Sequence, residues 1–285
     1  MKPTTQLSLR SLMPLAIAGL GIASVSSASA ATTAYRNLIL GDSPVVYFEF
    51  DETAGTTADN SGTYGATHDG TASGTVTVNQ TSADTFLGSA YSFGGGQVTA
   101  AALTSTLSEW TMEAWINFSD GGDSTVLSND ASGWNDDAII GLNPESGISG
   151  VGANQFGISQ QSAPGGPRDG VGTGTLNDDT WYHVALTAST SGSNMSVYLD
   201  GVLIASDTTP NVNFNFGPSD GLFVGAKRSN GSSLYGGLID ELAIYDTVLS
   251  QSDIAARANF NPIPEPSSTA LLGLGGLALI LRRRR

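Results

Sequence analysis

A turn rich in oxygen atoms, early in the chain, offers the chemistry of a calcium site. Asp59-Asn60-Ser61-Gly62 supplies a carboxylate, an amide carbonyl and a hydroxyl, and His68-Asp69-Gly70 follows, where the backbone can add a carbonyl. Calcium takes about six to eight oxygen ligands of these kinds. The same residue types also form turns by bonding their own backbone, so a turn without metal is the alternative. A second acidic stretch, from Asp120 to Asp137, offers further carboxylates or is simply solvated.

Two aromatic side chains are candidates for stacking on sugar rings. Trp134 lies in the polar stretch 128–137, outside the expected strands, and Tyr235 precedes the last expected strand. An aromatic face next to amide and carboxylate groups is common chemistry for a carbohydrate site. The alternative for Trp134 is that its ring closes the loop onto the domain.

Catalytic chemistry has no recognisable arrangement in the sequence. Cysteine is absent, the two histidines are His68 in a turn and His183 on an expected strand, and no Gly-x-Ser-x-Gly segment marks a serine nucleophile. A glycosidase needs two carboxyl groups held about 5 Å or further apart. Asp240 and Glu241 are adjacent, so on a regular strand they point to opposite faces, and Glu113 stands alone. We therefore expect a protein that is not an enzyme.

The first 30 residues have the character of a secretory signal peptide. Lys2 and Arg10 make a positive start, an apolar stretch follows from Leu12 to Val25, and Ala28-Ser29-Ala30 is a cleavage site for signal peptidase. The mature chain is then expected to begin at Ala31. Without cysteine, an exported domain takes its stability from a core and from bound ions rather than from disulfides.

Residues 261–285 differ in character from the domain before them. Pro264-Glu265-Pro266 stands in a proline stretch, residues 270–281 are apolar, and the chain ends in Arg282-Arg283-Arg284-Arg285. The apolar run is shorter than the ~20 residues that span a bilayer comfortably, and arginines prefer the cytoplasmic side. This order resembles the PEP-CTERM sorting signal, which implies processing by an exosortase, transient anchoring in the inner membrane, and delivery to the cell surface or extracellular matrix. The alternative is an ordinary membrane anchor.

The charge of the exported part is strongly acidic. Lys2, Arg10 and the four terminal arginines account for six of the 11 Lys and Arg residues. Residues 31–266 therefore hold five cations and all 26 Asp and Glu, a formal charge of −21. Such a surface argues against nucleic acid and anionic lipid as partners. The 36 glycines, with many Ser, Thr, Asn and Asp, are typical of a turn-rich β protein, and residues 31–260 suit one large β-sandwich.

Short runs of β-branched and aromatic residues recur along this part, and helical periodicity is nearly absent between Ala31 and Ser250. Asp200-Gly201 predicts a two-residue hairpin turn. Ser250, with Asp253 three residues later, predicts the start of a short helix. The stretches 119–137 and 159–179 indicate long loops. The expected strands are 45–50, 90–93, 111–118, 138–142, 155–158, 182–187, 195–199, 222–224 and 237–245.

Alternation along the strands assigns side chains to faces. Asp240 falls on one face with Leu238 and Leu242, and a carboxylate among apolar neighbours needs a partner when it is buried. The sets expected to share a face are Met112 with Ala114 and Ile116, Tyr182 with Val184 and Leu186, and Ile239 with Glu241 and Ala243.

Five segments, in order, resemble a LamG-like, concanavalin A-type jelly roll. They are 38–48 followed by Asp51-Glu52 and 59–62, 91–96, 110–116, 181–186 followed by 198–201, and 235–245 leading into Leu249-Ser250. The resemblance implies an all-β fold of two antiparallel sheets and a non-catalytic module that binds carbohydrate or protein, often with calcium. It also implies that Asp240 on the final strand meets the early loop, which pairs it with Asp59 and with backbone oxygens near Ser61 and His68.

We therefore expect an exported surface or matrix protein that binds an exopolysaccharide or surface glycan without catalysis, with calcium tying the two ends of the domain together. A structural or adhesion protein that contacts matrix proteins is the second hypothesis. A degenerate glycosidase or lyase is the third. It is disfavoured because hydrolases of this fold place Glu-x-Asp-x-x-Glu along one strand, and no such run occurs here.

Overall fold

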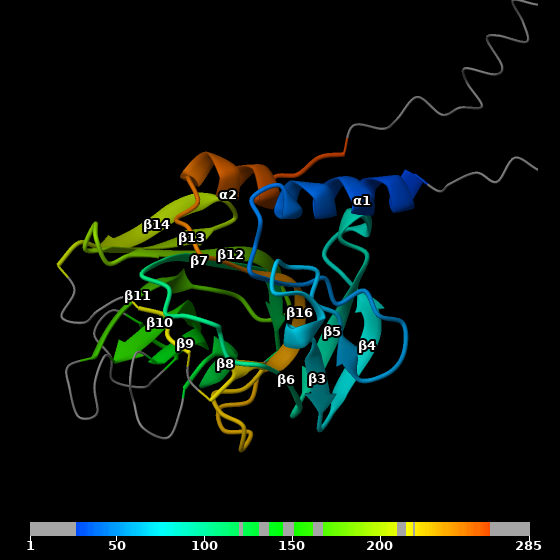
Figure 1. Ribbon diagram of the computed structural model, residues 1–285, viewed down its shortest axis with the longest axis horizontal. Helices are drawn as coiled ribbons and strands as arrows, with labels where there is room; N and C mark the ends of the chain where they lie inside the picture. Colours follow the sequence, from blue (N-terminus) through cyan, green and yellow to red (C-terminus); the bar gives the residue numbers. More distant parts are fainter. Residues whose placement is uncertain are drawn as a thin grey trace, which may run out of the picture.

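The fold consists of two antiparallel sheets packed face to face, with two helices on the outside of one of them (Figure 1). The computed structural model describes residues 27–119, 122–130, 137–144, 151–161, 168–209, 215–218 and 220–262. The expected all-β jelly roll is therefore confirmed. No helix among these residues has both the length and the apolarity needed to cross a membrane.

The first sheet, called sheet A, carries the two longest strands at its centre. Its strand order is β14 (Val202–Asp207), β13 (Asn194–Leu199), β12 (Trp181–Ser189), β7 (Glu109–Phe118), β16 (Gly236–Tyr245), β5 (Ser89–Gly94) and β4 (Val76–Thr81), and β1 (Val46–Phe48) also pairs with β16.

The second sheet, called sheet B, packs against sheet A. Its strand order is β11 (Arg168–Thr175), β10 (Gln155–Gln161), β9 (Asp137–Leu142), β8 (Ser124–Ser128), β15 (Leu222–Val224), β6 (Gln97–Ala100), β3 (Gly70–Ser73) and β2 (Thr57–Ala58).

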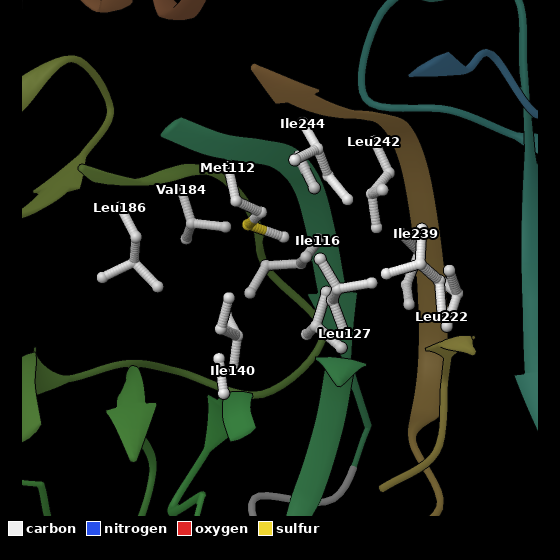
Figure 2. Close-up of a cluster of buried hydrophobic side chains, with 14 of the residues drawn as sticks. Met112, Ile116, Leu127, Ile140, Val184, Leu186, Leu222, Ile239, Leu242 and Ile244 are labelled. Atoms are coloured by element: carbon white, nitrogen blue, oxygen red, sulfur yellow. The ribbon is translucent and has the colours of Figure 1, made fainter. Parts of the chain in front are cut away.

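The main core lies between the two sheets. Figure 2 shows side chains of sheet A, such as Met112 and Val184, pointing toward Leu127 and Ile140 of sheet B. All four are fully buried, and each side chain of this size contributes about 1.5–3 kcal/mol when it leaves water. The faces expected for β7 and β12 are thus confirmed.

A second apolar cluster covers the opposite, outer face of sheet A. It is closed by helix α1 (Ser27–Leu40), helix α2 (Gln251–Ala258) and the 3₁₀ turn η2 (Thr85–Leu87) (Figure 1). Tyr35 and Ile39 lie four residues apart in α1, on one face of the helix, and both are buried. The expectation of almost no helix after Ala31 was therefore wrong for α1. Between residues 32 and 40 only Tyr35 and Ile39 are buried, which is too few to produce a strong periodic pattern.

Two expected loops contain strands. β8 lies inside 119–137 and β11 lies inside 159–179. All five residues of β8 are buried, although Ser and Thr make up most of the strand. β11 is rich in glycine, and at Gly172 the neighbours are close: a Cβ there would lie 3.1 Å from two methyl groups of Val151. Both strands therefore lack the apolar alternation by which the other strands are predicted.

The two turn predictions are confirmed. Asp200 and Gly201 connect β13 to β14 with positive φ at both residues, 48° and 78°, as a two-residue hairpin turn requires. Ser250 caps α2, since its hydroxyl accepts the Asp253 N–H while the Asp253 carboxylate accepts the Ser250 N–H.

Strand β16 contains a bulge that the alternation rule did not predict. Its register against β7 shifts between Asp240 and Ala243, and Glu241 adopts φ 52°. Beyond the shift the side chains change faces, so Ile239 and Leu242 both enter the main core while Ala243 joins the outer cluster. The expected sharing of a face by Ile239, Glu241 and Ala243 was therefore wrong.

Candidate functional site

The β16 bulge brings two carboxylates together under the outer layer of sheet A. Asp240 and Glu241 are 0% and 3% exposed. Burial raises the pKa of both carboxyl groups, and the charge of Asp240 raises that of Glu241 further. The expectation that these neighbours point to opposite faces was wrong, because the bulge adds a residue at this point and breaks the alternation.

Each of the two acids has one hydroxyl donor. Ser82 donates to Asp240 Oδ2, and Tyr47 donates to Glu241 Oε2. Asp240 Oδ1 is buried and has no hydrogen-bond partner among the described residues. A buried carboxylate oxygen without a partner is unfavourable unless a proton or a cation compensates it.

Two further carboxylates complete what we call the acidic cluster, Glu49, Asp51, Asp240 and Glu241. Asp51 accepts the Ser89 N–H at 2.6 Å, and burial raises its pKa. Glu49 accepts from Arg36 Nε at 2.9 Å, which places one cation at the edge of the cluster. The negative charges of Glu49 and Asp51 both disfavour ionisation of the two acids on β16.

The early loop does not supply ligands to Asp240 in the way the resemblance implied. Asp59 is exposed, and its N–H donates to Glu52. Ser61 donates to Glu49 of the acidic cluster. His68 is buried, with Nε2 2.9 Å from the Ala102 carbonyl and Nδ1 3.1 Å from Thr67 Oγ1.

The physical reason is that the Asn60 side chain ties this loop to its own backbone and to β1. Its Oδ1 accepts the N–H groups of Tyr47 and Gly62 at 2.8 and 2.9 Å, and its Nδ2 donates to the Gly65 carbonyl. Its own N–H donates to Asp69. The loop is thus closed by amide and carboxylate bonds, and Asp59 remains exposed to solvent.

A second charged group lies under helix α2, centred on Glu113, which is 1% exposed. Tyr245 donates to it at 2.5 Å, Arg257 Nε lies 3.0 Å away and His183 Nε2 lies 3.3 Å away. Burial opposes ionisation of Glu113, but the contacts with His183 and Arg257 outweigh it and lower the pKa. Arg257 also pairs with Asp42 after α1, so the group joins both helices to β7.

A pocket lined mostly by Asn, Gln, Ser and Thr lies at the edge of sheet A, between β4 and η2. It has a volume of about 570 Å³. Ser82 and Ser89 belong to its wall and also contact Asp240 and Asp51, so the pocket adjoins the acidic cluster. We call it the edge pocket. Its lining residues are Asn79, Gln80, Thr81, Ser82, Ala83, Asp84, Thr85, Gly88 and Ser89.

Of the two aromatic candidates for sugar stacking, Tyr235 is fully buried. Its ring packs in the main core with its centroid 6.4 Å from that of Phe93, and its hydroxyl donates to the Leu238 carbonyl. The prediction that it stacks on a ligand was therefore wrong, because the apolar ring is drawn between the sheets. Trp134 lies outside the described residues.

The remaining predicted residues fall in three places. Ala28 and Ala30 lie in the first turn of α1, and the cleavage between residues 30 and 31 stays a prediction. In the second acidic stretch, Asp123 accepts from Asn143, and Asp130 lies 2.7 Å from Arg228 Nη2. The residues of the sorting segment, Pro264, Glu265, Pro266, Arg282, Arg283, Arg284 and Arg285, lie outside the described part of the chain.

The edge pocket was missed at the sequence level. Val76, Val78 and the polar residues between them alternate as in a half-buried strand, so β4 could have been predicted. The pocket lies where the pairing of β4 with β5 shifts by one residue, next to Asn79, which has a φ of 57°. Asn tolerates this conformation better than most residues, but a single Asn is too weak a signal to predict a pocket.

Comparisons with known proteins agree with this architecture. A family model described as the concanavalin A-like lectin/glucanases superfamily matches residues 92–255, and one described as the PEP-CTERM protein-sorting motif matches residues 262–285. No curated protein matches the chain.

Two solved structures illustrate the fold. Domain 4 of AbnA, a GH43 extracellular arabinanase from Geobacillus stearothermophilus in complex with arabinotriose, has a TM-score of 0.55 at 21% identity, over 76% of this chain and 98% of that one. The binding domain of botulinum neurotoxin DC in complex with rat synaptotagmin II has a TM-score of 0.55 at 13% identity, over 77% of this chain and 52% of that one. At these identities the likeness is one of fold.

Proposed function

Because the chain belongs to the concanavalin A-like lectin/glucanases superfamily and ends in a PEP-CTERM sorting motif, we propose that it binds carbohydrate at the cell surface or in the extracellular matrix, without catalysis. The sorting motif implies an exported protein that an exosortase processes at the membrane. The expected carbohydrate is an exopolysaccharide or surface glycan of the producing cell or its neighbours.

The burial of the acids is the observation that carries the non-catalytic part of this proposal. Glycosidases act through two carboxyl groups that both reach the scissile bond. The carboxylates of Glu113, Asp240 and Glu241 are between 0% and 3% exposed and contact protein groups. A polysaccharide chain cannot reach them in this arrangement.

Carbohydrate binding is supported by the fold and by the surface chemistry. The arabinanase domain with the same fold was solved with arabinotriose. In this chain a pocket lined mostly by Asn, Gln, Ser and Thr opens at the edge of sheet A, and the predicted stacking residue Trp134 stands in a polar stretch of the sequence. The formal charge of −21 over residues 31–266 favours neutral sugars over acidic ones.

The test is a pull-down of the full chain in detergent micelles on a panel of insoluble polysaccharides, with reducing-end release measured in parallel. We expect retention on at least one neutral polysaccharide and no product. Trp134→Ala should weaken retention if that ring stacks on the sugar. Release of product that Glu113→Gln or Asp240→Asn removes would contradict the proposal and favour a glycosidase or lyase.

A structural or adhesion function through protein contacts is the second candidate. β14 forms an edge of sheet A, and Val202, Leu203 and Ile204 on it are 56%, 41% and 44% exposed. An apolar edge strand is a site where another strand can pair. Retention on no polysaccharide, together with binding to a purified matrix protein, would favour this function.

We further propose that a calcium ion stabilises the acidic cluster. The partnerless Oδ1 of Asp240 and the nearby charges of Asp51 and Glu49 fit a hard cation with oxygen ligands. The described residues contain no group of three or more His, Asp or Glu side chains arranged to hold a metal. Asp240 would therefore hold the ion with backbone and hydroxyl oxygens and at most one further carboxylate.

A further inference from the structure

The edge pocket lies where the register of strand β4 shifts against β5. Thr77 lies opposite Ser92 and Gln80 lies opposite Ala90, so β4 has one residue more than β5 over this interval. Asn79 accommodates the extra residue with φ 57°. Such a bulge bends an edge strand and changes the direction of its side chains, and bulges are frequent beside binding sites.

The wall of the edge pocket is held in place from behind. Ser82 is bonded to Asp240, and Ser89 donates its N–H to Asp51 and its hydroxyl to the Phe50 carbonyl. A Cβ on Gly88, which has φ 80°, would lie 2.1 Å from Asp51 Oδ1, so only glycine permits this approach. Below the pocket, η2 buries Phe86 and Leu87 in the outer apolar cluster. A wall fixed in this way loses little freedom when a ligand binds.

The lining of the pocket determines the class of ligand. Its side chains are amides, hydroxyls and one carboxylate, that of Asp84, together with Ala83 and Gly88. Among the described residues no Lys, Arg or His lines it, and its Ser82 and Ser89 contact Asp240 and Asp51 of the acidic cluster. Phosphate, sulfate and uronate groups are repelled by such a site, whereas hydroxyl groups can both donate to and accept from it.

We propose that the edge pocket binds the terminal sugar residues of a neutral, hydroxyl-rich glycan. Its volume of about 570 Å³ falls within the range of small-molecule sites, roughly 300–1,000 Å³. This inference rests on the proposed carbohydrate-binding function and assigns it to an edge of sheet A, on the side opposite β14 in the strand order.

The experiment compares variants of the full chain in detergent micelles, titrated with a panel of neutral oligosaccharides and a panel of uronic acid-containing ones. Asn79→Gly removes the amide and keeps the positive φ, and Thr81→Val removes a hydroxyl at nearly constant volume. Thr77→Val is the matched control, since Thr77 is exposed on the same strand and does not line the pocket. We expect each pocket variant to lose about tenfold in affinity for a neutral oligosaccharide, and the control to stay within about twofold.

The other outcomes distinguish a failure of the pocket inference from a failure of the proposed function. If the wild-type chain binds a neutral oligosaccharide and both pocket variants bind it equally well, the pocket inference fails and the proposed function stands. Binding of uronic acid-containing sugars alone also overturns the pocket inference. If no saccharide binds at millimolar concentration, both fail. Unchanged circular dichroism and melting temperature in the variants would show that a lost affinity is not a folding defect.

Discussion

At the scale of single residues, Asp240 is the side chain that most needs a further partner. It is fully buried, bonded through one oxygen to Ser82, and surrounded by like charges. Two chemical solutions exist, a proton or a cation. A chelator should lower the stability of the fold if Asp240 holds a cation, and should leave it unchanged if Asp240 is protonated.

We predict that calcium raises the melting temperature of the full chain in detergent micelles. An ion that binds only the folded state at a hundred times its Kd adds about 2.7 kcal/mol to the free energy of unfolding. Thermal unfolding with millimolar calcium and with chelator measures the shift, and Asp240→Asn should abolish it. Asp59→Asn is the control, because Asp59 is exposed and makes no bond to Asp240. An equal melting temperature with calcium and with chelator would indicate that a proton, and not calcium, compensates the buried Asp240 carboxylate.

Arg257 is the second residue whose substitution should strongly change the free energy of unfolding. It is fully buried and lies 3.0 Å from Glu113. Arg257→Met removes the cation and leaves the buried carboxylate, so we expect a loss of about 3–5 kcal/mol in the free energy of unfolding. Arg36→Met is the matched control: its side chain is 40% exposed, and a surface pair is worth at most about 1 kcal/mol. Denaturant titration measures both, and similar losses would contradict the assignment.

The pKa of Glu113 gives a pH dependence of known sign. Because the folded state lowers this pKa, the ionised form stabilises the fold above the pKa of the unfolded chain, and the contribution is lost as pH falls through the folded value. The destabilisation caused by Glu113→Gln should therefore be largest above about pH 5 and should shrink toward pH 3. Denaturant titration of the two proteins across this range gives the difference, and a difference independent of pH would rule out an ionised Glu113.

At the scale of secondary-structure elements, helix α1 begins within the expected signal peptide but packs on the domain. Tyr35 and Ile39 fill the outer apolar cluster, and Tyr35 also accepts from Trp115 Nε1 at 3.0 Å. Both residues follow Ala30, so they remain in the chain if signal peptidase cuts where the sequence predicts.

We predict that Ile39→Ala costs about 2–5 kcal/mol of stability, the range for truncating a large buried aliphatic side chain. Asn37→Ala, at an exposed position of the same helix, should cost less than about 0.5 kcal/mol. Melting temperatures of the two variants make the comparison. A small effect of Ile39→Ala would mean that α1 does not pack on sheet A in solution.

Some secondary-structure elements could be predicted from local sequence patterns, and others could not. Strands with apolar alternation, such as β7 and β12, and the Asp200-Gly201 turn follow from local patterns. The bulge in β16 does not, because nothing in Asp240-Glu241 indicates a positive φ at a glutamate. That bulge brings Asp240 and Glu241 together in the acidic cluster. The candidate site therefore depends on how β16 pairs with β7, which sequence periodicity does not predict. Tyr235 is a similar case, since an aromatic residue before a strand can face either water or the core.

At the scale of the whole molecule, the fold joins segments that are far apart in sequence. β16 lies near the carboxyl-terminal end of the domain, yet it sits inside sheet A between β7 and β5 and also pairs with β1. Likewise, the rings of Tyr35 and Phe260 lie 5.3 Å apart, which ties the first described helix to the residues after the last one. The all-β class with two antiparallel sheets was predictable from the sequence, but the strand order and this closure are properties of the complete domain.

The central position of β16 has a consequence for secretion. When a chain passes through a translocation channel from its amino terminus, residues 236–245 emerge late, after most of the domain. Until they arrive, β7 and β5 lack the strand that joins them, so we expect the emerging polypeptide to stay unfolded and sensitive to protease. A chain stopped at residue 235 should be digested rapidly, and one stopped at residue 262 should resist. The protein would thus complete its fold only when its sorting segment is about to reach the membrane.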